Sequence, residues 1–377
     1  MSRWHLVTGG YPPERGGVAD YSLLVARGLA RVGDEVRVWA PGRKRCDIEK
    51  DFIKVHRLAD RFGPRGIAAL NQALETNARI LVQYVPQAFG AKAMNLPFCA
   101  YLFSKRNRMP IDVMFHEVAC PIGRDQPIRH NFLGRVTRIM AMLVARAAAR
   151  IFVATSAWEP MLRSLGVRHT PIGWLPVPSN ITVRHDPDGV RATRRKYADE
   201  HSYLIGHFGT YGGLIAPLLG ELVASVLRMR FDATVLLLGR GAEDMRERMA
   251  RANSMFADRI VTPGVLTPAD LSRHLSACDL MIQPYPDGVT TRRGSAMATL
   301  AHGRAVITTS GHLTEPLWAE TRAVALAPVG DVGQLARLTA CVLDDEHRRI
   351  CLGSHARELY QRRFAIEHTI RALREDH

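Results

Sequence analysis

The fold of this chain is decided by residues 279–309, which run DLMIQPYPDGVTTRRGSAMATLAHGRAVITT. The apolar residues 280–282 predict a short buried strand, and the PYPDG segment after them predicts a turn. Small residues then predict a helix over 294–302, and residues 305–309 predict a second buried strand. A strand, a loop, a helix and a strand form half of a doubly wound α/β domain, which binds ligands at the carboxyl ends of its strands.

The loop before this helix carries hydroxyl groups and two basic residues directly into the helix N-terminus. Its residues are Thr290, Thr291, Arg292, Arg293, Gly294 and Ser295. Backbone N–H groups, the positive end of a helix dipole and guanidinium groups all bind phosphate. An isolated pair of arginines is more often a solvated surface turn. Because this pair lies at a strand-to-helix turn, we expect a phosphate or diphosphate site, with one arginine on the phosphate and the other paired with a carboxylate such as Asp287.

The length and composition predict a soluble globular protein with two α/β domains. The 377 residues exceed one ordinary core, while the hydrophobic fraction of 47% and the charged fraction of 23% are usual. The formal charge of +15 comes from 51 Lys and Arg against 36 Asp and Glu, and it indicates an anionic partner. A nucleotide or an acidic membrane fits better than a nucleic acid, because no run of aromatic and basic residues resembles an RNA-binding signature.

The six cysteines show no paired spacing such as C-x-x-C, so we expect free thiols and no metal site. The first residues predict a strand rather than a signal peptide. No apolar run approaches 18 residues. The expected location is therefore the cytoplasm.

The N-terminal region predicts a strand, a glycine-rich loop, a helix and a second strand. Gly16 and Gly17 lie just before the helix, where glycine allows a ligand to approach the backbone, although a tight turn also favours glycine. His116 ends a later apolar strand, where its ring can face a cleft. A core histidine with a local hydrogen bond explains it equally well.

The proline-rich stretch near residue 176 and the polar sequence after it predict a boundary between two domains. We expect an N-terminal Rossmann-like domain over 1–178, a linker over 179–200, a C-terminal Rossmann-like domain over 201–355 and a final helix over 356–377. The second domain opens on YLIGHFGTYGG, a strand that leads into a second glycine loop with Gly209 and Thr210.

A long helix expected over residues 128–150 is apolar on one face and carries arginines elsewhere. This pattern fits a helix packed in the core and, equally, a peripheral contact with an anionic membrane at the inner face of the cell membrane.

Sequence motifs along nearly the whole chain resemble retaining, nucleotide-sugar-dependent glycosyltransferases of family 4. The matching segments are GGYPPERGGVADYSLLVARGLARVGDEVRVWAP, QYVP, FHE, LLLGRG, VTPGVLTPADLSRHLSACDLMIQPYPDG and TLAHGRAVITTSG, in family order. The resemblance implies the GT-B fold, in which two Rossmann-like domains face a cleft and a C-terminal helix returns to the N-terminal domain.

The same resemblance implies an enzyme that moves a sugar from a nucleoside-diphosphate sugar to a hydroxyl acceptor with retention, without a metal or another cofactor. The acceptor would be a glycan, a glycolipid or a small molecule, as in bacterial polysaccharide or glycolipid synthesis. The N-terminal domain would lie on the acceptor side and the C-terminal domain would bind the donor. By matching positions, Gly16 and Gly17 border the donor phosphates and the acceptor, His116 lies near the donor sugar, and Gly209 opens the second ligand loop.

The sequence departs from the family pattern at its acidic and basic positions. Family members usually carry two glutamates eight residues apart, and the corresponding positions here are Thr290 and Ala298. Asp287 could take the first role, whereas nothing replaces the second. The usual basic residues after the second glycine loop are also missing, since Thr210 and Ala216 stand there. Arg292 and Arg293 are the nearest substitutes, and a divergent subgroup has a similar loop. A non-catalytic relative that binds a nucleotide or a partner enzyme is the main alternative, and an epimerase is a weaker one.

Overall fold

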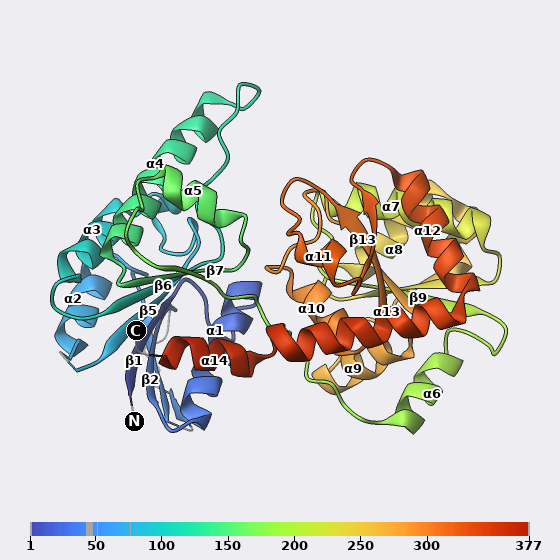
Figure 1. Cartoon of the computed structure of the whole chain (residues 1–377), viewed down its shortest axis with the longest axis horizontal. Coiled ribbons are helices and arrows are strands. Elements are labelled where there is room, and N and C mark those ends of the chain that lie inside the picture. Colours follow the sequence, from blue (N-terminus) through green and yellow to red (C-terminus); the bar gives the residue numbers. More distant parts are fainter. Residues whose placement is uncertain (1, 43–47, 51, 76, 376–377) are drawn as a thin grey trace. The chain divides into compact units, whose positions relative to one another are not determined.

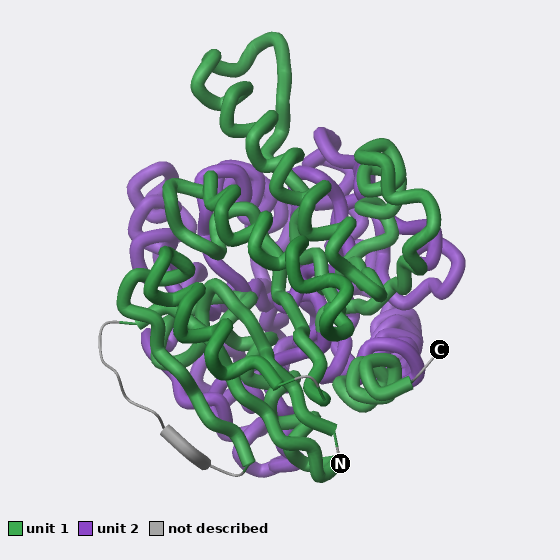
Figure 2. The backbone as a smooth tube through the Cα atoms, turned by 90° about the vertical axis from the view of Figure 1, so that its left-hand side faces the viewer, with its two compact units in different colours: residues 1–177, 366–377 green, residues 178–365 purple. Residues whose placement is uncertain are grey.

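The computed structural model describes residues 2–42, 48–50, 52–75 and 77–375. The chain forms two compact units, unit 1 with residues 1–177 and 366–377, and unit 2 with residues 178–365 (Figure 2). Each unit is a mainly parallel β-sheet with helices on both faces, as the alternating strand and helix pattern predicts (Figure 1). The expected pair of Rossmann-like α/β domains is confirmed.

The sheet of unit 1 has the strand order β3-β4-β2-β1-β5-β6-β7-β8. Its described strands pair in parallel, except that β3 pairs antiparallel with β4. The strands are β1 (Arg3–Thr8), β2 (Glu35–Pro41), β3 (Ile48–Lys50), β4 (Ile53–Leu58), β5 (Arg79–Tyr84), β6 (Ile111–Phe115), β7 (Arg150–Val153) and β8 (Ile172–Trp174). The helices are α1 (Gly17–Arg31), α2 (Pro64–Ala73), α3 (Leu96–Lys105), α4 (Ile128–Ala147), α5 (Trp158–Ser164) and α14 (Ile366–Arg374), with a 3₁₀ turn η1 (Ala91–Ala93).

The order in which strands are added to this sheet changes side between β1 and β5. After β1, the chain adds β2 and β4 on one side, and it then adds β5, β6, β7 and β8 on the other. Helices α2 to α5 pack on one face of the sheet around Phe98 and Phe115, and α1 and α14 pack on the other face around Trp4 and Leu29. The carboxyl ends of β1 and β5 therefore form a switch point, the usual ligand position in such sheets.

The C-terminal helix α14 belongs to unit 1, although 188 residues of unit 2 precede it in the chain, from 178 to 365. It lies along α1, where Ile370 fills the space above Gly28, since a Cβ on that glycine would approach its side chain to 2.5 Å. The buried Arg150 caps the helix, because its guanidinium donates to the carbonyl oxygens of Ala372 (3.3 Å) and Leu373 (2.7 Å). The expected return of the C-terminal helix to the N-terminal domain is confirmed, and the chain passes back at residue 366 rather than 356.

The sheet of unit 2 is parallel throughout its described strands, in the order β11-β10-β9-β12-β13-β14. These strands are β9 (Tyr203–Phe208), β10 (Ala233–Leu238), β11 (Ile260–Val261), β12 (Leu280–Gln283), β13 (Ala305–Ser310) and β14 (Ala325–Pro328). The helices are α6 (Pro187–Arg195), α7 (Ile215–Met229), α8 (Ala242–Ala252), α9 (Pro268–Ala277), α10 (Gly294–Ala301), α11 (Leu317–Glu320), α12 (Val332–Asp344) and α13 (Glu346–Leu359), with a 3₁₀ turn η2 (Ser254–Arg259) and a π turn η3 (Tyr360–Phe364). Here the switch point lies between β9 and β12.

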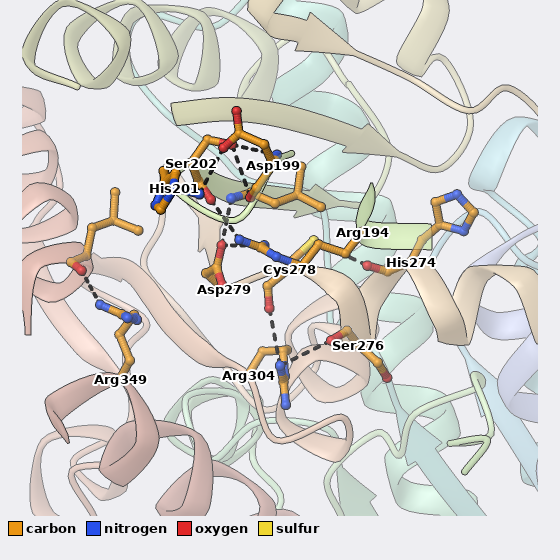
Figure 3. Close-up of polar contacts among 12 residues, drawn as sticks. Arg194, Asp199, His201, Ser202, His274, Ser276, Cys278, Asp279, Arg304 and Arg349 are labelled. Atoms are coloured by element: carbon orange, nitrogen blue, oxygen red, sulfur yellow. Dashed lines mark hydrogen bonds and ion pairs between the residues drawn. The ribbon is translucent and has the colours of Figure 1, made fainter. Parts of the chain in front are cut away.

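Residues 179–200, expected as a linker, lie in unit 2 and contain α6. Arg194 ties this segment to the sheet, because it donates to the carboxylate of Asp279 at 2.7 Å (Figure 3). The same carboxylate accepts from the backbone N–H of Leu204, in β9, at 2.7 Å. The polar composition of this segment did not indicate a packed helix. Its few apolar residues are enough to pack α6 on unit 2, because ion pairs such as Arg194–Asp279 hold the helix in place. These contacts lie at the amino ends of β9 and β12, opposite the edge where ligands bind in this architecture.

No helix within the described ranges is both long and apolar enough to cross a membrane.

Candidate functional site

The candidate site in unit 2 lies at the carboxyl ends of β9 and β12, where residues 209–214 and 284–293 leave the sheet. The second loop is fixed to the neighbouring strand β13. The backbone N–H of Tyr285 donates to the hydroxyl of Thr309 at 2.8 Å, and the N–H of Val289 donates to the Thr309 carbonyl at 2.8 Å. The loop is therefore part of the rigid frame of the sheet and presents its side chains in a fixed arrangement.

The two loops lie side by side. An ideal Cβ on Gly209 would be 3.7 Å from Nε2 of His207 and 3.8 Å from the side chain of Ser295, the second residue of α10. Gly212, Gly213 and Gly294 have open space at the Cβ position, and none of these glycines has a φ in the left-handed region. Neither backbone strain nor internal packing requires glycine here, which leaves room for a ligand to approach the backbone.

Asp287 holds both arginines of the loop. Arg292 donates to one carboxylate oxygen and Arg293 donates to the other. The side chains of Arg292 and Asp287 are each 17% exposed, and that of Arg293 is 22% exposed. Burial alone would raise the pKa of Asp287, but the charges of Arg293 and Arg292 hold that pKa below its usual value. The expectation that only one arginine pairs with Asp287 is wrong: both do, and the three groups together carry a charge of +1.

An aromatic ring orders the second arginine further. The guanidinium of Arg293 lies 4.7 Å from the ring centroid of Tyr285, and the Tyr285 hydroxyl lies 2.8 Å from the hydroxyl of Ser295. Stacking and ion pairing on two sides fix the plane of the guanidinium. Contacts thus run continuously from Ser295 through Tyr285 and Arg293 to Asp287.

Three buried polar atoms of these two strands and their loop lack a hydrogen-bond partner within the described part of the chain. They are Nε2 of His207, Oγ1 of Thr290 and Nε of Arg293. A buried polar group without a partner costs about 1–3 kcal/mol, so such groups are rare and call for a partner outside the protein. Their concentration at one sheet edge supports a polar ligand there.

His207 was not singled out from the sequence, because it sits in an apolar strand like an ordinary core residue. Its Nδ1 lies 2.9 Å from the carbonyl oxygen of Ile282, which can only accept, so Nδ1 carries the proton. Burial lowers the pKa of His207 to about 4. Its Nε2 is therefore a lone-pair acceptor for a donor such as a ligand hydroxyl.

Glu315 is a second residue that sequence patterns missed. Its buried carboxylate accepts from the backbone N–H (3.1 Å) and the hydroxyl (2.6 Å) of Thr291, and from the indole N–H of Trp318 (2.8 Å). The polar groups of Thr291 are thus engaged inside the protein and anchor the loop. The separation of 24 residues explains why no local motif indicated this contact.

The other expected positions of unit 2 differ in accessibility. Thr210 is exposed on the glycine loop, whereas Thr290 is completely buried. Ala298 of α10 is also completely buried and packs among apolar residues. Ala216 is buried in α7.

The candidate residues of unit 1 lie at the ends of β1 and β6. Gly16 precedes α1 in an extended conformation and Gly17 begins the helix, and a Cβ on either would meet open space. His116 follows β6 and is 8% exposed. Its Nε2 lies 2.8 Å from Oε1 of Gln83, its ring packs edge-on against Tyr21 at 4.8 Å, and burial lowers its pKa to about 3. His116 is therefore a neutral, firmly oriented ring.

No group of three or more His, Cys, Asp or Glu side chains that could hold a metal ion occurs in residues 2–42, 48–50, 52–75 and 77–375.

A comparison with family models matches a part of the chain that includes the loop 284–293 but not residues 207–213. Residues 214–345 match the family model described as "Glycosyl transferases group 1". A search of curated proteins found no match to the sequence.

Solved structures share the whole fold. The sucrose-phosphate synthase of Thermosynechococcus elongatus aligns with a TM-score of 0.76 and 16% identity over 99% of this chain and 97% of its own. HepE (Alr3699) of Anabaena, solved with UDP and glucose, aligns with a TM-score of 0.72 and 16% identity over 99% and 98%. WaaG, a glycosyltransferase involved in lipopolysaccharide biosynthesis, aligns with a TM-score of 0.62 and 15% identity over 95% of both chains.

The chain therefore has the GT-B fold of these proteins. The matched domain together with this fold supports glycosyltransferase activity.

Proposed function

We propose that the protein is a retaining glycosyltransferase that moves a sugar from a nucleoside-diphosphate sugar to a hydroxyl acceptor. Unit 2 binds the donor and unit 1 the acceptor side. The observation that carries the proposal is the edge between β9 and β12, where open glycine positions, two fixed arginines and three unpartnered polar atoms meet. HepE, of the same fold, has been solved with UDP-glucose, so a uridine nucleotide is the first donor to test.

The diphosphate of the donor binds against the loop 209–213 and the N-terminus of α10. Thr210, Gly294 and Ser295 offer backbone N–H and hydroxyl groups there, while Arg293 offers its Nε and the positive charge. Gly209 leaves space for the ligand but no donor, because its N–H already donates to the Leu238 carbonyl at 3.1 Å. Thr290 supplies a hydroxyl, and Thr291 holds the loop through Glu315.

In the reaction, the bond between the anomeric carbon and the diphosphate oxygen breaks and its electron pair goes to the diphosphate. The acceptor oxygen bonds to the same face of that carbon, and its proton leaves with the diphosphate. Negative charge grows on the leaving group, and the arginines and helix N-termini stabilise it without a metal ion. Asp287 keeps both guanidiniums in place for this step.

His116 and the first glycine loop act from unit 1. A neutral imidazole with a pKa of about 3 bears no charge at physiological pH, so His116 contributes a hydrogen bond to the donor sugar rather than a proton. Gly16 and Gly17 let the substrates approach the backbone at the start of α1. The acceptor we propose is a glycan or glycolipid of bacterial polysaccharide or glycolipid synthesis in the cytoplasm.

The test is a thermal-shift screen with UDP-, GDP-, ADP- and dTDP-sugars, followed by an assay for nucleoside-diphosphate release with and without candidate acceptors. A donor at a hundred times its dissociation constant stabilises the folded state by about 2.7 kcal/mol. Release of nucleoside diphosphate with the matching sugar supports the proposal. No stabilisation by any of the four classes refutes donor binding.

A non-catalytic nucleotide-binding or partner-binding protein is the second candidate. Two observations favour it: Ala298 is buried in the core where the family glutamate is expected, and both arginines are already bound to Asp287. Stabilisation by a nucleotide sugar without any release of nucleoside diphosphate, with or without acceptor, would establish this alternative.

A further inference from the structure

The N-terminal end of α4 projects from unit 1 together with the loop before it (Figures 1 and 2). The buried residues of α4 begin only at Gly134, so the first six residues of the helix make no core contact. We name residues 121–135 the α4 tip.

The α4 tip exposes large apolar side chains. Ile128 is 89% exposed, Phe132 60% and Ile122 40%, and Ile139 just beyond the tip is 45% exposed. Residues 128, 132 and 139 are spaced by four and seven positions, so they lie on one face of the helix, opposite the face that packs in unit 1. Scattered apolar residues on a surface are ordinary, but a row of them on a projecting helix marks an interaction site.

The α4 tip is ordered by its own contacts. The backbone N–H of Gly123 donates to Oδ1 of Asn131 (3.0 Å), Nδ2 of Asn131 donates back to the Gly123 carbonyl (2.9 Å), and Arg138 donates to the Cys120 carbonyl (2.9 Å). The loop packs closely on the helix, since a Cβ on Gly134 would meet Ile122 at 2.5 Å and Cys120 at 3.2 Å. The exposed apolar row is thus a preformed surface rather than a loosely held segment.

Positive charge surrounds this row. Arg124, Arg129 and Arg135 are exposed on the α4 tip, and Asp125 is its only acidic residue, which gives 3 − 1 = +2 before the two further arginines of α4 are counted. Two aliphatic groups and an aromatic ring beside arginines match the boundary of a bilayer, where apolar groups enter the acyl region and cations meet lipid phosphates.

We propose that the α4 tip binds an anionic lipid bilayer by inserting Ile128 and Phe132 while its arginines contact the headgroups. Charge complementarity favours this occupant over a second copy of the chain, because two such tips would bring like charges together. A polyanion such as nucleic acid would use the arginines but would leave the exposed aliphatic groups without a role. The proposal goes beyond the proposed transfer reaction and does not depend on it.

The test uses the full-length protein in flotation assays with vesicles of phosphatidylcholine alone or mixed with phosphatidylglycerol. We expect binding to the anionic vesicles only, and weaker binding as salt is raised. The variant Ile128→Ser/Phe132→Ser should lose about tenfold or more in partitioning, and Arg124→Gln/Arg129→Gln/Arg135→Gln should lose about tenfold or more as well.

Matched controls come from unit 2. Phe231→Ser removes a phenylalanine that is 83% exposed, and Arg195→Gln/Arg251→Gln/Arg337→Gln removes the same charge from exposed positions. Both controls should bind like the wild type. These four positions and those of the tip are exposed, so all variants should melt like the wild type.

The proposal is overturned if the wild type binds neither vesicle at low salt, or if the tip variants bind as well as their controls. A dimer in solution that Ile128→Ser/Phe132→Ser dissociates, without vesicle binding, would assign the surface to a second copy instead.

Discussion

Replacement of Arg293 tests the proposed donor site most directly. In the structure its guanidinium has one edge on Asp287, one face on Tyr285 and its Nε without a partner in the described chain. A charge-assisted hydrogen bond to a phosphate oxygen contributes about 1.5–3 kcal/mol, so Arg293→Ala should weaken nucleoside-diphosphate binding roughly 10- to 150-fold. Arg293→Lys should recover only part of this loss, because lysine keeps the charge but not the planar fork.

The shared carboxylate makes the double variant informative. Arg292→Ala/Arg293→Ala leaves Asp287 without either partner, and that carboxylate then repels the diphosphate by about 3 kcal/mol, for two unit charges ~6 Å apart at an effective dielectric constant of ~20. The double variant should therefore bind more weakly than the two single losses predict. Adding Asp287→Asn should restore part of the affinity, since it removes the unpaired charge.

The assay is calorimetric titration of UDP, GDP, ADP and dTDP into each variant, with thermal melting to confirm folding. Arg251→Ala serves as the control, because Arg251 forms an exposed ion pair with Glu247 on α8. If the single and double variants bind nucleoside diphosphate like the wild type, the two arginines only hold Asp287, and the donor site must lie elsewhere. If Asp287→Asn weakens the double variant further, the repulsion argument fails.

Three further predictions concern unit 1 and acid stability. His116→Ala should lower turnover by roughly 100-fold with little change in melting temperature, if the ring contacts the transition state, and wild-type turnover in the folded variant would make it a core residue only. Arg150→Met should destabilise unit 1 by about 3 kcal/mol in urea unfolding, because it removes the 2.7 Å ion pair of the buried Asp112 and the cap of α14. The double variant Arg150→Met/Asp112→Asn should lose less stability, because no unpaired charge stays buried. Equal losses in the two variants would contradict this reasoning. His5, His116 and His207 have pKa values lowered to about 4, 3 and 4, mainly by burial, so the unfolded chain binds protons below pH 6.5 that the folded chain does not. Their stabilising effect is complete above pH 6.5 and should be lost as pH falls toward 4, at roughly 1 kcal/mol per pH unit for each histidine, and urea midpoints that are equal at pH 7 and pH 5 would refute it.

The fold was predictable because it follows from local patterns. The apolar run before PYPDG, the small-residue helix and the second strand appear in the structure as β12, α10 and β13, within one residue of the expected ends. The alternation of strands and helices along both halves predicts the parallel sheets for the same reason.

The site contacts were less predictable because they join residues far apart in the chain. Thr291 is anchored by Glu315, and Arg150 caps a helix more than 220 residues later. The chemistry of His207 depends on a carbonyl of the neighbouring strand, which no single-strand pattern contains. The pairing of both arginines with Asp287 depends on how tightly the loop turns. The PYPDG sequence predicts that a turn is present but not its exact geometry.

The charge balance of this loop separates binding from catalysis. Arg292, Arg293 and Asp287 together carry +1, and the N-termini of α7 and α10, which both begin at this edge, add about +0.5 each. The sum of about +2 matches the two negative charges of a bound nucleotide sugar. Departure of the diphosphate adds negative charge that this positive charge does not balance. A transferase must therefore strengthen other hydrogen bonds to the leaving group during the step. The donors available in the described site are Nε of Arg293 and the hydroxyl of Thr290, which lack partners in the described chain. Thr290→Val should therefore slow turnover more than it weakens nucleotide-sugar binding if the protein is an enzyme, whereas in a non-catalytic protein it can alter binding alone.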